Sequence, residues 1–363
     1  MIRALYRHGA KPFFFAQDPE DVHDRMCELG QNIGRFRVTR WLARKFFRYE
    51  NNMLEQDIWG IRFSNPIGLA AGFDKNAHLT AVLPSVGFGF EEVGSITGER
   101  CEGNPRPRLW RLPQSRGLVV YYGLKNDGCE AIAARLHEKR FAIPIGISVA
   151  KTNSPETVDV GAGIADYVKA FRAFLDIGQY FTINISCPNT FGGEPFTDPA
   201  RLHLLLTEID KIETQKPILL KMPADITTEQ LDALVTVANQ HRVHGFILSN
   251  LTKAFDRSEI HSDEIKGMVH GGISGKPTFQ ASNELLAHLY KTVGKRYVII
   301  GCGGVFSAED AYEKICQGAS LIQLITGMIF EGPQCIGEIN RGIVELLKRD
   351  GFKTVSEAVG SRF

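Results

Sequence analysis

Short apolar runs recur eight times along this chain from residue 67 onward, and most are followed by a segment with helical periodicity. The runs are residues 67–72, 90–97, 143–150, 180–187, 217–222, 245–250, 297–304 and 321–326. Because the runs are almost continuously apolar, they are typical of strands buried on both faces of a parallel sheet. Helical stripes fall at residues 163–177, 198–212, 227–241, 278–292, 307–317 and 334–348.

Eight successive β-then-α units predict an α/β fold of the (β/α)8, or TIM-barrel, type. A doubly wound sheet is the alternative, but it usually has fewer strands. We expect the barrel to span residues 56–350, preceded by a helical segment (1–55) and followed by a C-terminal tail (351–363). The longest interval between runs, 98–142, contains PRLWRLPQSRGLVVYYG, which predicts a hairpin inserted above the barrel before its second helix.

The N-terminal segment falls outside the repeat. Residues 18–34 predict a short helix, and residues 35–49 (RFRVTRWLARKFFRY) predict a basic amphipathic helix rich in aromatic residues. Such a helix lies either in a membrane interface or against the barrel with its charged face in water, and the sequence leaves both interpretations open. The longest apolar runs fall short of the roughly 20 residues that a transmembrane helix needs, and the N-terminus does not read as a secretory signal.

Composition excludes several classes of protein. The formal net charge is +1, which gives no electrostatic case for nucleic acid as a partner. The seven cysteines show no CxxC motif and no paired spacing, so neither a metal site nor a disulfide framework is indicated. Scattered thiols favour a reducing compartment. We therefore expect a cytoplasmic protein, either free or held peripherally on the cytoplasmic membrane.

Glycines cluster after three of the last runs. They lie at residues 301–304, at Gly327 beside Thr326, and at 271–276, which we read as a third glycine-rich loop. Barrels of this class commonly bind phosphate after their seventh and eighth strands, where exposed backbone N–H groups attract an anion. The pattern therefore favours a phosphate-bearing cofactor, with plain turns as the alternative.

Two lysines follow strand ends, where a barrel enzyme places its chemistry. Lys221 ends the apolar run ILLK, and Lys75 follows AAGFD. Lys221 is either an ion-pair partner of a neighbouring carboxylate or a cation beside the electron-rich edge of a flavin. Lys75 is either a solvated residue at a helix start or a similar functional cation that binds a substrate carboxylate.

The run FTINISCPNT places a thiol between two amides. Asn184 and Asn189 flank Cys187, and Pro188 ends the strand beside them. A cysteine here is often a small core residue, but as a thiolate it can take a proton from carbon. Uncharged amides suit recognition of a cyclic amide or imide. The following residues 191–196, FGGEPF, have paired glycines that suit a mobile lid.

Together these motifs resemble one known family. NPIGLAAGFDKN, GFGFEEVGSIT, NPRPRLWRL, INISCPNT, PILLKM, SNLT, GGISGKP and IIGCGGV occur in the order typical of dihydroorotate dehydrogenases, flavin enzymes of pyrimidine synthesis. The resemblance runs from about residue 13 to 340. FFFAQDPEDVHDRM and the basic helix after it are similar to the membrane-associated, quinone-using branch, in which two helices form a hydrophobic entry to the flavin.

The resemblance implies FMN as the cofactor and dihydroorotate, or an analogue, as the substrate. The residues that it places around FMN are Ala71, Gly72, Ser95, Ser148, Asn184, Lys221, Ser249, Gly275, Gly303, Gly304, Thr326 and Gly327. Those that it places around the substrate are Lys75, Asn184, Asn189 and Asn250. Cys187 falls at the position of the catalytic base, which takes a proton from C5 while C6 gives a hydride to flavin N5. Electrons then pass to a quinone, with residues 1–50 as the expected membrane contact.

The sequence departs from the family pattern around the substrate. The departures are Val120 and Ser148 for asparagine, Tyr122 for methionine, Leu251 for threonine, Ile325 for tyrosine, and Cys187 for the serine of the quinone-using branch. Two further hypotheses therefore stand beside the first. One is a divergent FMN-dependent paralogue that acts on another small cyclic or conjugated substrate. The other is a non-catalytic barrel that binds a phosphate-bearing ligand.

Overall fold

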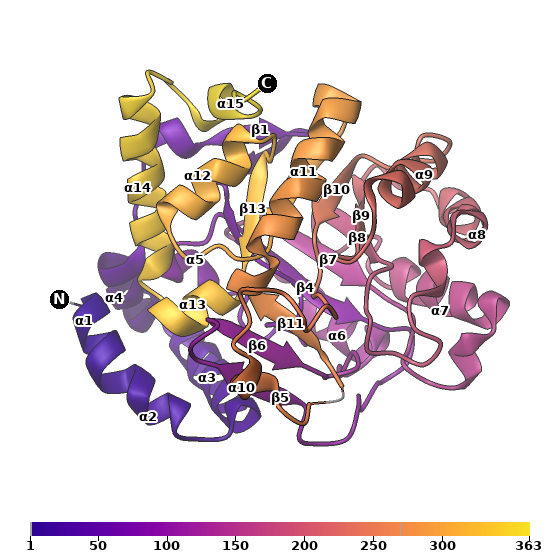
Figure 1. Ribbon diagram of the computed structural model, residues 1–363, viewed down its shortest axis with the longest axis horizontal. Coiled ribbons are helices and arrows are strands. Elements are labelled where there is room, and N and C mark those ends of the chain that lie inside the picture. The colour runs from indigo at the N-terminus through magenta and orange to yellow at the C-terminus, as the bar shows by residue number, and fades with distance from the viewer. Residues whose placement is uncertain (1, 269) are drawn as a thin grey trace.

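Eight parallel strands form a closed barrel in the computed structural model, which describes residues 2–268 and 270–363 (Figure 1). The strands are β3 (Ile67–Leu69), β4 (Phe90–Ile96), β7 (Ile145–Val149), β8 (Tyr180–Asn184), β9 (Ile218–Lys221), β10 (Gly245–Leu248), β12 (Val298–Cys302) and β13 (Leu321–Leu324). The barrel closes where β13 pairs with β3. Each strand lies inside one of the eight apolar runs, so the predicted (β/α)8 fold is confirmed.

Helices surround the barrel on its outside (Figure 1). They are α5 (Leu83–Val86), α6 (Cys129–Leu136), α7 (Val160–Arg172), α8 (Pro199–Asp210), α9 (Thr228–Ala238), α11 (Phe279–Val293), α12 (Ala308–Cys316), α13 (Thr326–Glu331), α14 (Cys335–Arg349) and α15 (Val355–Ala358). The one-turn helix α10 (Ser262–Ile265) instead lies against residues 114–115, whose N–H groups donate to Glu264. Single 3-10 turns are η3 (Glu156–Val158), η4 (Pro195–Thr197), η5 (Lys276–Thr278) and η6 (Gly294–Arg296). All six predicted helical stripes contain a helix. Capping boxes at Thr227 and Ser307 start α9 and α12, because each hydroxyl accepts a backbone N–H of the first turn.

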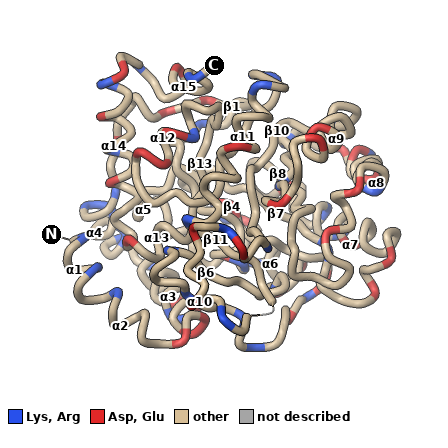
Figure 2. Tube along the Cα trace, in the orientation of Figure 1, with Lys and Arg blue, Asp and Glu red and all other residues tan. Residues whose placement is uncertain are grey.

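The N-terminal segment packs as helices beside the barrel. It contains α1 (Ile2–Leu5), the π-helical turn η1 (Tyr6–Ala10), α2 (Lys11–Phe15), α3 (Pro19–Arg35), α4 (Arg37–Phe47) and the turn η2 (Asn52–Leu54). Lys and Arg recur along α4, and α1 carries Arg3 (Figure 2). On and next to α4, the side chains of Phe36, Trp41 and Phe46 are 64%, 55% and 61% exposed. No helix in the described ranges is long and apolar enough to cross a membrane.

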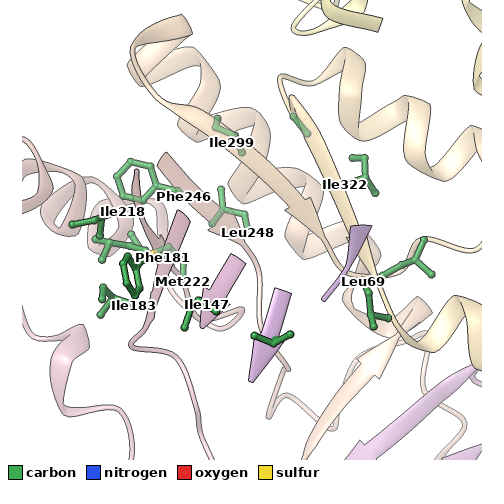
Figure 3. Packing of buried hydrophobic residues seen from close by; sticks show 14 of the residues in the cluster. Leu69, Ile147, Phe181, Ile183, Ile218, Met222, Phe246, Leu248, Ile299 and Ile322 are labelled. Atoms are coloured by element: carbon green, nitrogen blue, oxygen red, sulfur yellow. The ribbon is translucent and has the colours of Figure 1, made fainter. Parts of the chain in front are cut away.

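Two hydrophobic layers hold the barrel together. Strand side chains that point outward, among them Ile147, Phe181 and Phe246, pack against the surrounding helices (Figure 3). Inside the barrel, Phe90 and Tyr180 fill the N-terminal strand ends. Their rings require glycine on the neighbouring strands, because a Cβ on Gly68 would lie 2.3 Å from the Phe90 ring, and one on Gly146 would lie 2.1 Å from the Tyr180 ring. A dense aromatic floor therefore closes this end of the barrel.

A hairpin that the sequence analysis missed covers that floor. Its strands β1 (Gln56–Ile58) and β2 (Ile61–Phe63) are antiparallel, and Phe63 packs edge-on against Phe90 at 5.5 Å between ring centroids. The strands are only three residues long, which is too short for the alternation of a strand to stand out in sequence.

A three-stranded sheet covers the opposite end. The predicted insertion is confirmed as the hairpin of β5 (Leu109–Leu112) and β6 (Gly117–Val120). The segment 271–276 was wrongly read as a glycine-rich loop, because residues 272–275 form strand β11 (Gly272–Gly275), antiparallel to β6. This pairing joins segments about 150 residues apart, and the local glycine content gives no sign of it. The sheet places residues of the insertion over the mouth of the barrel.

Candidate active site

A cavity of about 170 Å³, here called the inner cavity, lies at the C-terminal ends of the barrel strands. It contains the predicted catalytic residue Cys187 and all the predicted substrate residues, which are Lys75, Asn184, Asn189 and Asn250. Ala71, Gly72, Ser95, Lys221 and Thr326, predicted to bind the cofactor, also line it. The inserted sheet closes it from above through Leu109, Leu118 and Val120. Residues from distant parts of the chain therefore meet in one enclosed space.

A second cavity of about 80 Å³, here called the glycine cavity, adjoins the first. The two share Ala71, Lys221 and Thr326. The remaining predicted cofactor residues that line the glycine cavity are Ser249, Gly275, Gly303, Gly304 and Gly327. Ser148 lines neither cavity; its hydroxyl lies 2.8 Å from that of Ser95, which in turn accepts a hydrogen bond from Asn184 Nδ2 at 2.8 Å. Ser148 is thus placed one side chain behind the cavity wall.

The wall between the two cavities carries a buried cation. Lys221 is 5% exposed, and no carboxylate among the described residues lies within ion-pair distance of its ammonium. Lys221 interacts electrostatically with Glu92, which lies inside the barrel. Burial raises the pKa of Glu92, and the charge of Lys221 opposes that rise. Gln323, also on the glycine cavity, has a buried Oε1 with no donor in the described chain. Both groups fit an anionic, hydrogen-bonding ring such as a reduced flavin.

A second cation, Lys75, lines the inner cavity. The ammonium of Lys75 lies 3.9 Å from the centre of the Tyr122 ring, and burial lowers the pKa of Lys75 to about 8. The hydroxyl of Tyr122 is buried without a hydrogen-bond partner in the described residues. A desolvated ammonium held against an aromatic face, with no direct carboxylate partner, is suited to an incoming carboxylate.

The three amides of the inner cavity are held in fixed orientations. Asn184 Oδ1 accepts from the Ser186 hydroxyl at 2.9 Å. Asn250 Nδ2 donates to the Ser186 carbonyl at 2.6 Å, and Asn189 Nδ2 donates to the Val120 carbonyl at 2.8 Å. Asn184 and Asn250 are bonded to protein through both their oxygen and their nitrogen, since Asn184 Nδ2 donates to Ser95 and Asn250 Oδ1 accepts the Leu251 N–H. Because these contacts orient the amides before a ligand binds, no further ordering of the side chains is needed.

Cys187 lies beside the amides, with a smaller space behind it. Burial raises the pKa of its thiol to about 11, while a backbone hydrogen bond and the Lys151 ammonium oppose the rise. Lys151 donates to the Phe191 carbonyl at 2.8 Å, which fixes the start of the 191–196 segment. In the same segment burial raises the pKa of Glu194 to about 7. The thiol is therefore protonated at neutral pH, and Lys151 is the cation that favours its ionisation.

A third cavity, of about 270 Å³, lies among the N-terminal helices and is here called the helical entry. It adjoins the inner cavity, because His23, Phe73, Leu109, Leu118 and Ile329 line both. Its walls are mostly apolar, from α2, α3 and α4, with Arg111 and Tyr6 as polar exceptions. His23 Nε2 lies 2.9 Å from the Phe73 carbonyl. The sequence analysis named neither His23 nor Arg111. His23 lies on α3 and Arg111 on β5, and they line the same cavity only because these two elements pack against each other.

Comparisons with known proteins point in one direction. Residues 53–347 match the family model described as dihydroorotate dehydrogenase. A relative from Gloeobacter violaceus, named dihydroorotate dehydrogenase (quinone), is 39% identical over 360 residues, covering 99% of each chain. A relative of the same name from Crocosphaera subtropica is 36% identical, covering 95% of this chain and 94% of its own. The crystal structure of DHODH from Eimeria tenella in complex with ferulenol is similar with a TM-score of 0.80 and 26% identity, covering 92% of this chain and 95% of its own.

Proposed function

The chain belongs to the dihydroorotate dehydrogenase family, and from this premise we propose that it oxidises dihydroorotate to orotate in pyrimidine biosynthesis, with a quinone as electron acceptor. The reaction is an oxidation of a CH–CH bond. The observation that carries the proposal is the full-length similarity to quinone-dependent relatives, together with an inner cavity that adjoins an apolar helical entry.

FMN is the cofactor that we propose for the inner and glycine cavities. Its fit is supported by the unpaired Lys221 ammonium, the unsatisfied Gln323 carbonyl and the glycine backbone of residues 303–304. Lys221 would stabilise negative charge on the ring, and the glycine cavity would hold the phosphate. When bound, FMN supplies a two-electron acceptor for the hydride from C6 and a donor to the quinone.

The substrate would lie between Lys75 and the amides. Lys75 would pair with the carboxylate of dihydroorotate, and Asn184, Asn189 and Asn250 would hydrogen-bond its ring amides. Cys187 would take the proton from C5, and Lys151 would favour the thiolate form. Because these groups come from separate strand ends and loops, the barrel itself sets their separation.

A divergent substrate is the second candidate, and Val120 and Leu251 favour it. Both line the inner cavity, where they present apolar side chains, and Val120 provides only its carbonyl to Asn189. A ring amide that faces them would lose a hydrogen bond, which costs about 1–3 kcal/mol. A substrate with an apolar edge at that position would not incur this cost.

The quinone would enter through the helical entry. Its apolar walls suit a lipid-soluble ring and tail, and Phe36, Trp41 and Phe46 are exposed among the basic residues of α4. We therefore propose that residues 1–55 form a unit that rests on the cytoplasmic face of a membrane, while the barrel of residues 56–350 carries the flavin. The tail of residues 351–363 takes no part in this arrangement.

Anaerobic mixing of the purified protein with dihydroorotate tests the proposal. We expect the visible absorbance of the oxidised flavin to bleach, and a soluble quinone analogue to restore it. Orotate should also perturb the spectrum of the oxidised protein. A flavin spectrum that neither compound changes would favour the divergent substrate, and a colourless protein would favour a binding barrel without catalysis.

A further inference from the structure

A lysine ammonium is buried in the helix layer behind the glycine cavity. Lys314 lies on α12 and is 0% exposed. Its Nζ donates to the Ser282 hydroxyl and, at 2.7 Å, to Asn283 Oδ1 on α11, and it lies 5.1 Å from the centre of the Phe279 ring. None of these partners carries a negative charge. Within the described chain no carboxylate lies within ion-pair distance of Lys314, and the nearby Asp310 and Glu313 pair with other cations.

A single side chain, that of Ser282, lies between the Lys314 ammonium and the backbone of the glycine cavity. A Cβ built on Gly303 would lie 3.2 Å from the Ser282 hydroxyl that Lys314 holds, and 2.9 Å from the Thr278 hydroxyl. A Cβ on Gly301 would lie 3.0 Å from Lys314 Cδ. Gly303 and Thr278 line the glycine cavity, whereas Lys314 and Ser282 stand directly behind it. The backbone that faces the cavity is thus backed by this lysine.

The other charged and titratable groups near Lys314 are already engaged. Asp310 on α12 pairs with Lys276 at 2.6 Å and accepts the Phe306 N–H at 2.9 Å. Glu313 on α12 pairs with Arg362 at 3.3 Å. Cys302 on β12 is the remaining group that raises the pKa of Lys314, and Lys276 lowers it. Burial dominates and lowers the pKa of Lys314 to about 7, so the ammonium loses its proton readily near neutral pH.

We propose that Lys314 is a positioning residue for the phosphate of the cofactor: it holds Ser282 against Gly303 and provides the buried positive charge that the phosphate balances. This inference rests on the proposed function, because FMN is the phosphate-bearing ligand. A dianionic phosphate in the glycine cavity would favour the charged amine, so binding FMN takes up a proton at Lys314. Lys314 would also make the protein favour FMN over flavins that lack a phosphate.

Release of FMN from the holoenzyme measures this coupling. The purified yellow protein is diluted to nanomolar concentrations, and free FMN is followed by its fluorescence at pH 7, 8 and 9. The phosphate is a dianion throughout this range, since its second pKa is about 6. The wild-type protein is compared with Lys314→Met, and with Lys295→Met, which removes an exposed lysine at the opposite end of the barrel.

The wild-type dissociation constant should rise with pH, with a slope approaching ten-fold per pH unit where Lys314 loses its proton. Lys314→Met should bind FMN about ten-fold more weakly at pH 7 and show a flat profile, so the two curves converge at high pH. Lys295→Met should follow the wild type. The phosphorus NMR signal of bound FMN should shift in Lys314→Met but stay in place in Lys295→Met.

Two results would overturn the inference. One is a flat wild-type profile, which is decisive even if Lys314→Met fails to fold. The other is a Lys314→Met protein with the wild-type dissociation constant and slope, since a purely structural role predicts no change in pH dependence. A wild-type protein that never carries flavin would instead refute the proposed cofactor, so the two failures are distinguishable.

Discussion

Glu91 is a carboxyl group buried in the wall of the barrel, and it makes the stability of the fold depend on pH. It lies in β4, pairs with Leu69 and Ile145 on the neighbouring strands, and is 0% exposed. Neither of its carboxylate oxygens has a donor among the described residues. Burial and the nearby Asp74 carboxylate, which accepts the His78 and Leu79 N–H groups, raise the pKa of Glu91 well above its usual range.

The sign of the effect follows from where the proton is held. In the unfolded chain Glu91 has a pKa of about 4.3, whereas the folded protein keeps its proton to much higher pH. Below about pH 4.3 Glu91 is protonated in both the folded and the unfolded state, so its ionisation does not lower the free energy of unfolding. As pH rises toward the folded pKa, the unfolded state loses its proton first, and stability falls by about 1.4 kcal/mol per pH unit. Between pH 5.0 and 6.5 the loss amounts to about 2 kcal/mol.

Glu91→Gln removes this loss, because the amide cannot ionise and can donate to Asp74. Urea unfolding at pH 5.0, 5.75 and 6.5 should show the variant gaining stability over the wild type by about 1.4 kcal/mol for each pH unit. FMN is kept at the same concentration for both proteins at each pH, so that its contribution cancels in the difference between them. Glu345→Gln, at an exposed position on α14, is the matched control and should show no such trend. A difference between Glu91→Gln and wild type that stays constant with pH would refute the reasoning.

The remaining predictions concern the site and the proposed membrane surface. Cys187→Ala should slow reduction of the bound flavin by dihydroorotate about 10²- to 10⁴-fold without loss of FMN in a stopped-flow experiment; loss of flavin would instead mean a structural role. With saturating substrate the wild-type reduction rate should rise with pH up to the thiol pKa of about 11, and a flat profile would exclude this base. Lys75→Met should weaken orotate binding about ten- to hundred-fold in a spectral titration, whereas equal affinity would remove the lysine from the substrate site. Trp41→Ser combined with Phe46→Ser should abolish sedimentation with anionic liposomes, while Leu204→Ser, at a 51% exposed position on α8, should not; equal sedimentation of both would argue against α4 as the membrane contact.

The barrel was predictable because its strands are buried on both faces. The run GFIL is apolar throughout and ILLK is apolar up to Lys221, and the stripes between the runs carry local capping signals such as Thr227 and Gln230. The elements that were missed owe their structure to distant partners. The β1–β2 hairpin is stabilised by Phe90, and β11 is a strand only because β6 offers it an edge.

The part of the site formed by strand ends was also predictable from the sequence. Strand ends converge at one end of any parallel barrel, so Cys187, Lys221 and Asn250 were placed together correctly from their positions alone. Ser148 was not, since only the register between β4 and β7 puts it behind Ser95. The helical entry was equally inaccessible, because its wall combines an N-terminal helix with an inserted strand.

The sheet of β5, β6 and β11 also sets an order of events during synthesis of the protein. Its third strand ends at Gly275, and the glycine cavity needs residues up to Gly327. The ribosome must therefore have translated the chain through residue 327 before the nascent protein has a complete site for the proposed cofactor. If FMN is the cofactor, a shortage of it would affect a chain whose apolar barrel strands are already synthesised but whose cofactor site is still empty.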